Sequence, residues 1–163
     1  MNFDILIKNA RVIDGTNTPW YKTDIGIVND KIEFIGKSIN DTSSTLIDAH
    51  EQFVCPGFID SHTHFDLGPF TFLNFQDHLL KRRLYQGITT QITGCCGCSP
   101  APITKENKDE WLLDYGINNT DQINWNSFAE YLNELSKQKL GTNYAGYVGH
   151  GTIRFNVLGF SDK

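Results

Sequence analysis

The sequence predicts an α/β protein in which a small β-sheet layer precedes parallel strands joined by helices. Residues 1–54 consist of short strand patterns separated by turn residues. After residue 54, strand and helix patterns alternate, and this alternation is typical of parallel sheets with right-handed crossovers. Three predicted strands also end in chemistry-bearing segments, H-T-H, G-C-C-G-C and G-H-G. Because α/β proteins place their sites at the C-terminal ends of parallel strands, we expect these segments to meet.

The first layer is predicted by alternation of apolar and other residues. F-D-I-L-I-K, at residues 3–8, has the period of a half-buried strand, and A-R-V-I follows it as a second strand. I-G-I-V, N-D and K-I-E-F-I-G predict a hairpin with Asn29 and Asp30 at its tip. T-L-I-D-A-H, at residues 45–50, predicts a further short strand.

The second part begins with F-V-C-P-G-F-I-D at residues 53–60, a nearly continuous apolar run. Such a run predicts a strand that is buried on both faces. Residues 75–86 then predict a helix with Gly87 as its C-cap, and the β-branched I-T-T-Q-I-T at residues 88–93 predicts a second strand.

The last elements follow a loop that contains two prolines. Ser127 and Glu130 form the pattern of a capping box, which predicts a helix that continues to about Lys139. N-Y-A-G-Y-V-G predicts a third strand that ends at His150.

Charge and cysteine usage exclude several classes of protein. A net charge of −5 argues against a general nucleic-acid binder. The N-terminus lacks the pattern of a signal peptide, and no apolar run approaches the ~18 residues of a membrane span. Three of the 4 cysteines are clustered, unlike a secreted disulfide framework. We therefore expect a cytoplasmic protein without nucleic-acid or membrane partners.

His62 and His64 are two residues apart after the predicted buried strand. On an extended backbone both imidazoles point to the same face, so both can bind one metal ion. A pair of surface or hydrogen-bonded histidines is the alternative interpretation. The position directly after Asp60, at a strand end, favours the metal.

Cys95, Cys96 and Cys98 leave more than one interpretation open. A closed structural zinc site is one possibility, but it normally needs four ligands, and a second cysteine pair exists only through distant Cys55. A redox-sensitive loop is another possibility. Because neighbouring side chains on an extended backbone point in opposite directions, we expect only one of Cys95 and Cys96 to be a metal ligand.

Asp66 and His150 are candidate substrate-binding residues. Asp66 has the same parity as the two histidines but follows the expected strand end, where turn carboxylates are common. His150 follows the third predicted strand, where a hydrogen-bonding role is the alternative.

Several long segments together resemble the D-aminoacylase group (N-acyl-D-amino-acid deacylases) of the amidohydrolase superfamily. They are D-I-L-I-K-N-A-R-V-I-D-G-T, P-G-F-I-D-S-H-T-H, G-I-T-T-Q-I-T-G-C-C-G-C-S-P-A-P and G-Y-V-G-H-G-T-I-R. The group's cysteine segment usually has the form G-N-C-G-F-S-P, so the resemblance assigns the metal-binding cysteine to Cys96. Its histidine segment is closer to H-S-H-D-D, so Thr63 and Phe65 depart from the group while Asp66 is retained.

The resemblance implies a (β/α)8 barrel preceded by part of a small β-sandwich domain. Residues 1–54 would belong to the sandwich, and residues 55–163 to the first β/α units of the barrel. A complete barrel takes at least ~200 residues, so we expect the barrel to be incomplete in this chain. The sequence does not determine an oligomeric state.

The implied activity is hydrolysis of the amide bond of an N-acyl-D-amino acid, a small-molecule substrate. One or two zinc ions held by His62, His64 and Cys96 would activate water and polarise the acyl carbonyl. The group's general acid–base aspartate comes from a later barrel strand. We therefore expect no such residue here, and no catalysis by this N-terminal part alone.

Two other functions remain open. The first is a cyclic-amide hydrolase related to dihydropyrimidinase and dihydroorotase, although those relatives would bring a bridging lysine where this chain has cysteines. The second is a non-catalytic metal-binding remnant that is stable at 163 residues.

Overall fold

The computed structural model divides the chain between Pro56 and Gly57 into two units, each with its own sheet. The sequence placed this boundary two residues earlier. The structure describes residues 1–71, 76–114, 117, 123–138 and 140–161. Within these residues, no helix is long and apolar enough to cross a membrane.

The first unit is a five-stranded sheet with the order β3-β2-β1-β4, and β5 also pairs with β1. The strands are β1 (Asn2–Val12), β2 (Tyr21–Val28), β3 (Lys31–Gly36), β4 (Thr42–Asp48) and β5 (Phe53–Val54). β1, β2 and β3 pair antiparallel, whereas β4 and β5 run parallel to β1. The predicted hairpin is confirmed, because Asn29 and Asp30 join β2 to β3.

A local irregularity explains why the sequence predicted two strands where β1 is one. The register of β1 against β2 shifts between Ile7 and Ala10, and Asn9 has a left-handed φ of 57°. The Asn9 amide donates to Oδ1 of the buried Asp24 at 2.9 Å. A bulge of this kind interrupts the alternation of side chains without ending the strand.

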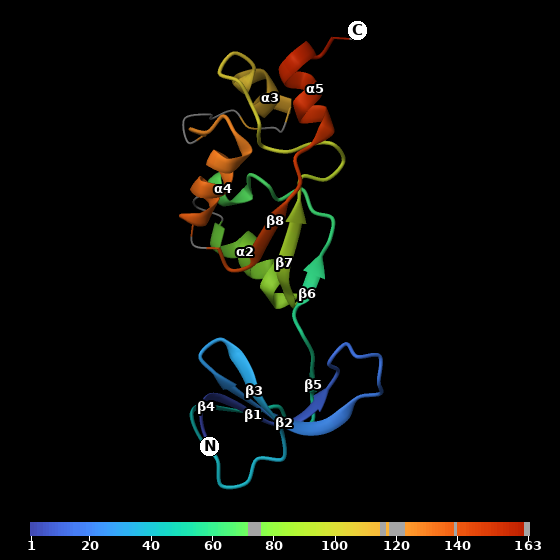
Figure 1. Ribbon diagram of the computed structural model, residues 1–163, viewed down its shortest axis with the longest axis vertical. Coiled ribbons are helices and arrows are strands. Elements are labelled where there is room, and N and C mark those ends of the chain that lie inside the picture. The colour runs from blue at the N-terminus through green and yellow to red at the C-terminus, as the bar shows by residue number, and fades with distance from the viewer. Residues whose placement is uncertain (72–75, 115–116, 118–122, 139, 162–163) are drawn as a thin grey trace. The chain divides into compact units, whose positions relative to one another are not determined.

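The second unit contains a three-stranded parallel sheet with the order β6-β7-β8. Its elements are β6 (Phe58–Asp60), α1 (Gly68–Thr71), α2 (Gln76–Tyr85), β7 (Ile88–Thr93), α3 (Lys108–Asp114), α4 (Phe128–Ser136), β8 (Asn143–Gly146) and α5 (His150–Leu158). The three strands point the same way in Figure 1, and their C-terminal ends face α3 and α5. The predicted parallel sheet and the strand over residues 88–93 are confirmed.

The prediction of a strand buried on both faces over residues 53–60 is wrong. The run is divided between β5 and β6, and Phe53, Phe58 and Ile59 are 56%, 57% and 65% exposed. Among the described residues, β6 is an edge strand with β7 as its one neighbour. Apolar composition predicts that a strand can be buried, but burial also requires a layer that covers it.

The predicted helices are confirmed where the structure describes them. α2 ends at Tyr85, and the left-handed Gly87 follows it with φ of 80°, whereas Phe75 lies outside the described residues. α4 ends at Ser136, before Lys139, which also lies outside them. The core under these elements consists of Leu67, Phe70, Ala101, Leu112, Ile123, Trp125, Tyr131 and Leu135.

Three helices, α1, α3 and α5, were not predicted, and the third strand is shorter than expected. β8 ends at Gly146, and His150 begins helix α5 instead of ending a strand. The β-branched residues of α5 favour a strand locally. Helix α5 is fixed by tertiary contacts, because Phe155 packs on Trp111 of α3 with ring centroids 4.9 Å apart.

The capping box of α4 gives a direct test of this local structure. The Ser127 hydroxyl accepts from the Glu130 amide at 3.2 Å, and the Glu130 carboxylate accepts from the Ser127 amide at 2.8 Å. The latter bond lowers the pKa of Glu130, so its contribution is present at neutral pH and is lost as the pH falls through the folded-state pKa.

We expect Ser127→Ala to lower the free energy of unfolding at neutral pH by about 1 kcal/mol, because an N-terminal amide of the helix loses its acceptor. Ser127→Asp keeps an acceptor and should lie close to the wild type. Denaturant unfolding of the three chains measures the difference. Equal stability of the alanine and aspartate variants would contradict the prediction.

Candidate metal centre

The parallel pairing of β6 and β7 places two chemistry-bearing loops side by side. Asp60, the last residue of β6, is the register partner of Gln91, so β7 continues for two residues beyond the end of β6. The Thr63 amide then donates to the Ile92 carbonyl at 3.1 Å and extends this pairing beyond the end of β6. His62 and His64 flank Thr63 on this extension, just after the strand and not within it.

His62, His64 and Cys96 meet at this edge of the sheet. Their ligand atoms all lie within 4.8 Å of one another, and all three residues are exposed. The His62 Nε2 atom is 3.2 Å from Cys96 Sγ, and the two imidazole centroids are 5.5 Å apart. The structure therefore brings together the three residues that the sequence predicted as ligands.

The backbone of residues 94–98, the cysteine turn, gives Cys96 a different orientation from Cys95 and Cys98. Gly94, Cys96 and Gly97 have left-handed φ values of 76°, 55° and 79°. A cysteine in this conformation carries a steric cost that glycine avoids. The turn directs the Cys96 thiol towards His62, whereas the Cys95 thiol donates back to the Ile92 carbonyl at 3.6 Å.

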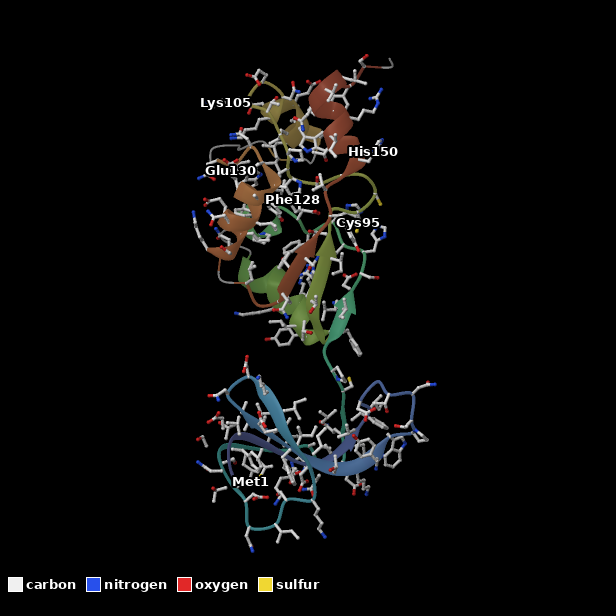
Figure 2. All side chains as sticks on the ribbon, viewed as in Figure 1. Met1, Cys95, Lys105, Phe128, Glu130 and His150 are labelled. Carbon is white, nitrogen blue, oxygen red and sulfur yellow. The ribbon has the colours of Figure 1, made fainter. Side chains whose placement is uncertain are left out.

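Cys98 has a different environment. It packs against Ile103, Trp111 and Phe155, a small apolar cluster beneath the turn. Burial raises the pKa of the Cys98 thiol, and the nearby Asp114 carboxylate adds to this effect. Because the thiolate is the metal-binding form, a buried thiol with a raised pKa is a poorer ligand than an exposed one. Figure 2 labels Cys95 at the C-terminal end of β7.

Asp66 does not lie where a substrate could reach it. Its side chain is fully buried, with an exposure of 0%, and its Oδ1 accepts from the Gly94 amide at 2.7 Å. Burial raises the pKa of this carboxyl, an effect that the Gly94 hydrogen bond opposes. The expectation that Asp66 contacts substrate therefore conflicts with its burial in this structure.

His150 is exposed and begins α5, beside the cysteine turn (Figure 2). The next turn of backbone fixes its position, because the Thr152 amide donates to the Gly97 carbonyl at 3.1 Å. The buried Thr152 hydroxyl also accepts from the Ser99 amide at 2.8 Å. His150 is not one of the three clustered ligand residues found among the described residues.

Sequence reasoning missed Gly94 and Ser99, which position the turn. A Cβ on Gly94 would collide with the Tyr147 carbonyl oxygen, so the close approach of β7 and the segment after β8 requires glycine. The Ser99 hydroxyl accepts from the Gly149 amide at 2.9 Å and is buried. Gly94 and Gly97, which stand on either side of Cys95 and Cys96, were the sequence feature that could have indicated a tight turn here.

The donor set fits zinc. Two imidazoles and a thiolate are ligands that this ion prefers, and a tetrahedral zinc with bonds of about 2.0–2.3 Å separates its ligands by about 3.3–3.7 Å. The 3.2 Å between His62 and Cys96 is close to that separation. Three ligands leave room for water or for further ligands.

Comparison with known proteins identifies the family. A sequence profile of the amidohydrolase family matches residues 45–158. The chain belongs to this family. The D-aminoacylase of Alcaligenes xylosoxydans xylosoxydans is 37% identical over an alignment of 163 positions, which covers 96% of this chain and 31% of that protein.

Solved structures agree with this assignment. N-acyl-D-glutamate deacylase from Bordetella bronchiseptica, complexed with zinc and a phosphonate inhibitor, matches with a TM-score of 0.76 at 30% identity, over 96% of this chain and 31% of that one. A D-aminoacylase studied for its binuclear metal centre matches with a TM-score of 0.76 at 34% identity, over 95% and 31%.

The chain spans about a third of the length of these relatives. The sequence and structure matches confirm the resemblance to the D-aminoacylase group and an α/β fold of the amidohydrolase kind.

We expect Cys96→Ser to weaken zinc binding by at least ~10-fold. Changing a residue that only orients a metal ligand already costs about this much, and Cys96 is proposed to be a ligand itself. Cys95→Ser should leave the affinity unchanged, because that thiol faces the Ile92 carbonyl. Competition with a chromophoric chelator at fixed pH measures both variants. Equal losses in Cys95→Ser, Cys96→Ser and Cys98→Ser would instead indicate a three-thiolate site.

Proposed function

We propose that this chain is the N-terminal part of a zinc-dependent amidohydrolase that hydrolyses N-acyl-D-amino acids to a carboxylate and a free D-amino acid. In this proposal β6, β7 and β8 are the first strands of a (β/α)8 barrel that this chain does not complete. The five-stranded sheet of residues 1–56 is then part of the accompanying β-sandwich.

One observation carries the proposal: a cysteine at the end of the second parallel strand meets an H-x-H pair at the end of the first. The ligand atoms of His62, His64 and Cys96 lie within 4.8 Å of one another. The same segments align with D-aminoacylase over 96% of this chain. The two relatives of known structure described above, one in complex with zinc and one with a binuclear metal centre, support one or two zinc ions here.

The residues of this chain would divide the work between holding the metal and shaping its surroundings. His62 and His64 would hold the ion through imidazole nitrogens, and Cys96 would hold it through its sulfur as the thiolate. Zinc held by these residues would supply Lewis acidity for polarising the acyl carbonyl and for activating water. His150, exposed beside the cysteine turn, is the candidate for contact with substrate.

No residue of this chain is proposed as the general acid or base. That group is expected from a later barrel strand, so residues 1–163 are proposed to be inactive by themselves. Because His62, His64 and Cys96 are all exposed, a metal ion held by them would be accessible to a substrate. It would also be accessible to residues from further parts of the protein.

The thiolate also separates this proposal from a cyclic-amide hydrolase. A bridging lysine would be expected among the metal ligands of that class, whereas this chain places the Cys96 thiol beside the histidine pair. A structural zinc site is disfavoured as well, because Cys98 packs into an apolar cluster and Cys95 faces a backbone carbonyl.

The test uses the native protein, captured from its own cells with an antibody raised against residues 1–163. Its intact mass is measured first and compared with the 18.5 kDa of this chain. We expect a heavier protein that hydrolyses N-acetyl-D-amino acids, spares the L enantiomers, loses activity with a chelator and regains it with zinc.

The control substrate for this assay is dihydrouracil, a cyclic amide. Hydrolysis of dihydrouracil without hydrolysis of N-acetyl-D-amino acids would contradict the proposed substrate class. A native mass of 18.5 kDa together with tight zinc binding and no turnover would favour the metal-binding remnant.

A further inference from the structure

We propose that Asp66 is a positioning residue, which sets the distance between the cysteine turn and the two histidines by holding the Gly94 amide. This inference rests on the proposed metal centre and adds a role for a buried carboxylate that is not a ligand. The Asp66 Oδ1 accepts from the Gly94 amide at 2.7 Å.

The bond joins the two ligand-bearing loops at equivalent points. Asp66 follows His64 by two residues, and Gly94 precedes Cys96 by two residues. Each end of the bond is therefore one short peptide segment from a predicted ligand. A shift of Gly94 relative to Asp66 would change the separation of Cys96 from the imidazoles directly.

The cysteine turn requires an external hold. Gly94, Cys96 and Gly97 all have left-handed φ values, and such a conformation at a cysteine is unfavourable by itself. The Gly94 backbone is also confined by the Tyr147 carbonyl on one side. The Asp66 Oδ1 atom fixes the Gly94 amide with a short hydrogen bond of 2.7 Å.

Asp66 is itself fixed to the core of the second unit. The buried Tyr131 hydroxyl donates to the Asp66 backbone carbonyl at 2.9 Å. Tyr131 packs with Trp125 of the same core, their ring centroids 5.4 Å apart. The position of the Asp66 carboxyl is therefore fixed by the core, and its bond to Gly94 fixes the cysteine turn relative to that core.

The burial of Asp66 is costly for a purely structural role. Its Oδ2 atom is buried without a hydrogen-bond partner among the described residues, and a buried carboxylate with an unpaired oxygen opposes folding. An apolar side chain could fill such a place at lower cost, as is found for many buried charged groups. It could not accept from Gly94.

The test compares Asp66→Leu, which removes the acceptor, with Asp66→Asn, whose amide oxygen can still accept from Gly94. Each variant of the 163-residue chain is titrated with cobalt(II), and the thiolate-to-cobalt charge-transfer band is recorded together with the affinity. Asp109→Leu removes an exposed acidic residue of α3 and serves as the control for lost charge.

We expect Asp66→Leu to weaken cobalt binding by about 10-fold or more and to reduce the charge-transfer band, as for other residues that orient metal ligands. Asp66→Asn and Asp109→Leu should stay near the wild type. A wild-type band and affinity in Asp66→Leu would overturn the inference, as would equal losses in Asp66→Asn and Asp66→Leu.

Failure of the metal centre is distinguishable from failure of this inference. If the wild type shows no thiolate band at all, the metal centre itself is wrong. If Asp66→Leu does not fold, hydrogen exchange of the wild-type amides tests the role of Asp66 instead. The Gly94 amide should be protected from exchange. Exchange as fast as that of the exposed Gly15 would overturn the role of Asp66.

Discussion

The parallel pairing of β6 with β7 is the constraint on which the proposed metal centre depends. The pairing places the end of β6 beside the last residues of β7 and continues as the Thr63–Ile92 hydrogen bond, so residues that are 32 and 34 positions apart in the sequence lie close together. Neither loop carries a metal site by itself. In the proposed centre, His62 and His64 would supply two nitrogen ligands, and Cys96 would supply the sulfur that determines the kind of site.

Packing above the strand ends then holds this arrangement. The Ser99 carbonyl accepts from the Trp111 indole at 3.2 Å and from the Thr152 hydroxyl at 3.1 Å, all within buried surroundings. These bonds connect the loop after β7 to α3 and to α5. Satisfied buried polar groups fix a single geometry more strictly than apolar packing, which tolerates sliding. The cysteine turn therefore lies between two anchored segments, Ser99 on one side and Gly94 on the other.

Sequence pattern predicted the parts of this structure that depend on local rules. The hairpin at Asn29, the capping box of Ser127 and the strand after Gly87 follow from turn, cap and β-branched chemistry. The histidine pair and the cysteine cluster were likewise visible as candidate ligands. Spacing alone could not choose between Cys95 and Cys96, because the choice depends on a left-handed φ that only the folded turn imposes.

The failures share a physical cause, since each concerned burial or tertiary contact. The apolar run at Phe58 and Ile59 has the composition of a buried strand, but a covering layer is needed to bury it. Helix α5 was missed because its β-branched residues favour a strand, while its contacts with Ser99 and Trp111 come from distant segments. Asp66 was interpreted as a turn or substrate carboxylate because nothing local indicates its bond to Gly94.

The most direct test of the central claim is zinc X-ray absorption of the zinc-loaded chain. The proposed centre predicts one sulfur at about 2.3 Å and the remaining ligands as nitrogen or oxygen at about 2.0–2.1 Å. This result would mean that a single thiolate, with the histidines, holds the ion. Two or three sulfurs in the first shell would contradict the account, because the cysteine cluster would then form a site of its own.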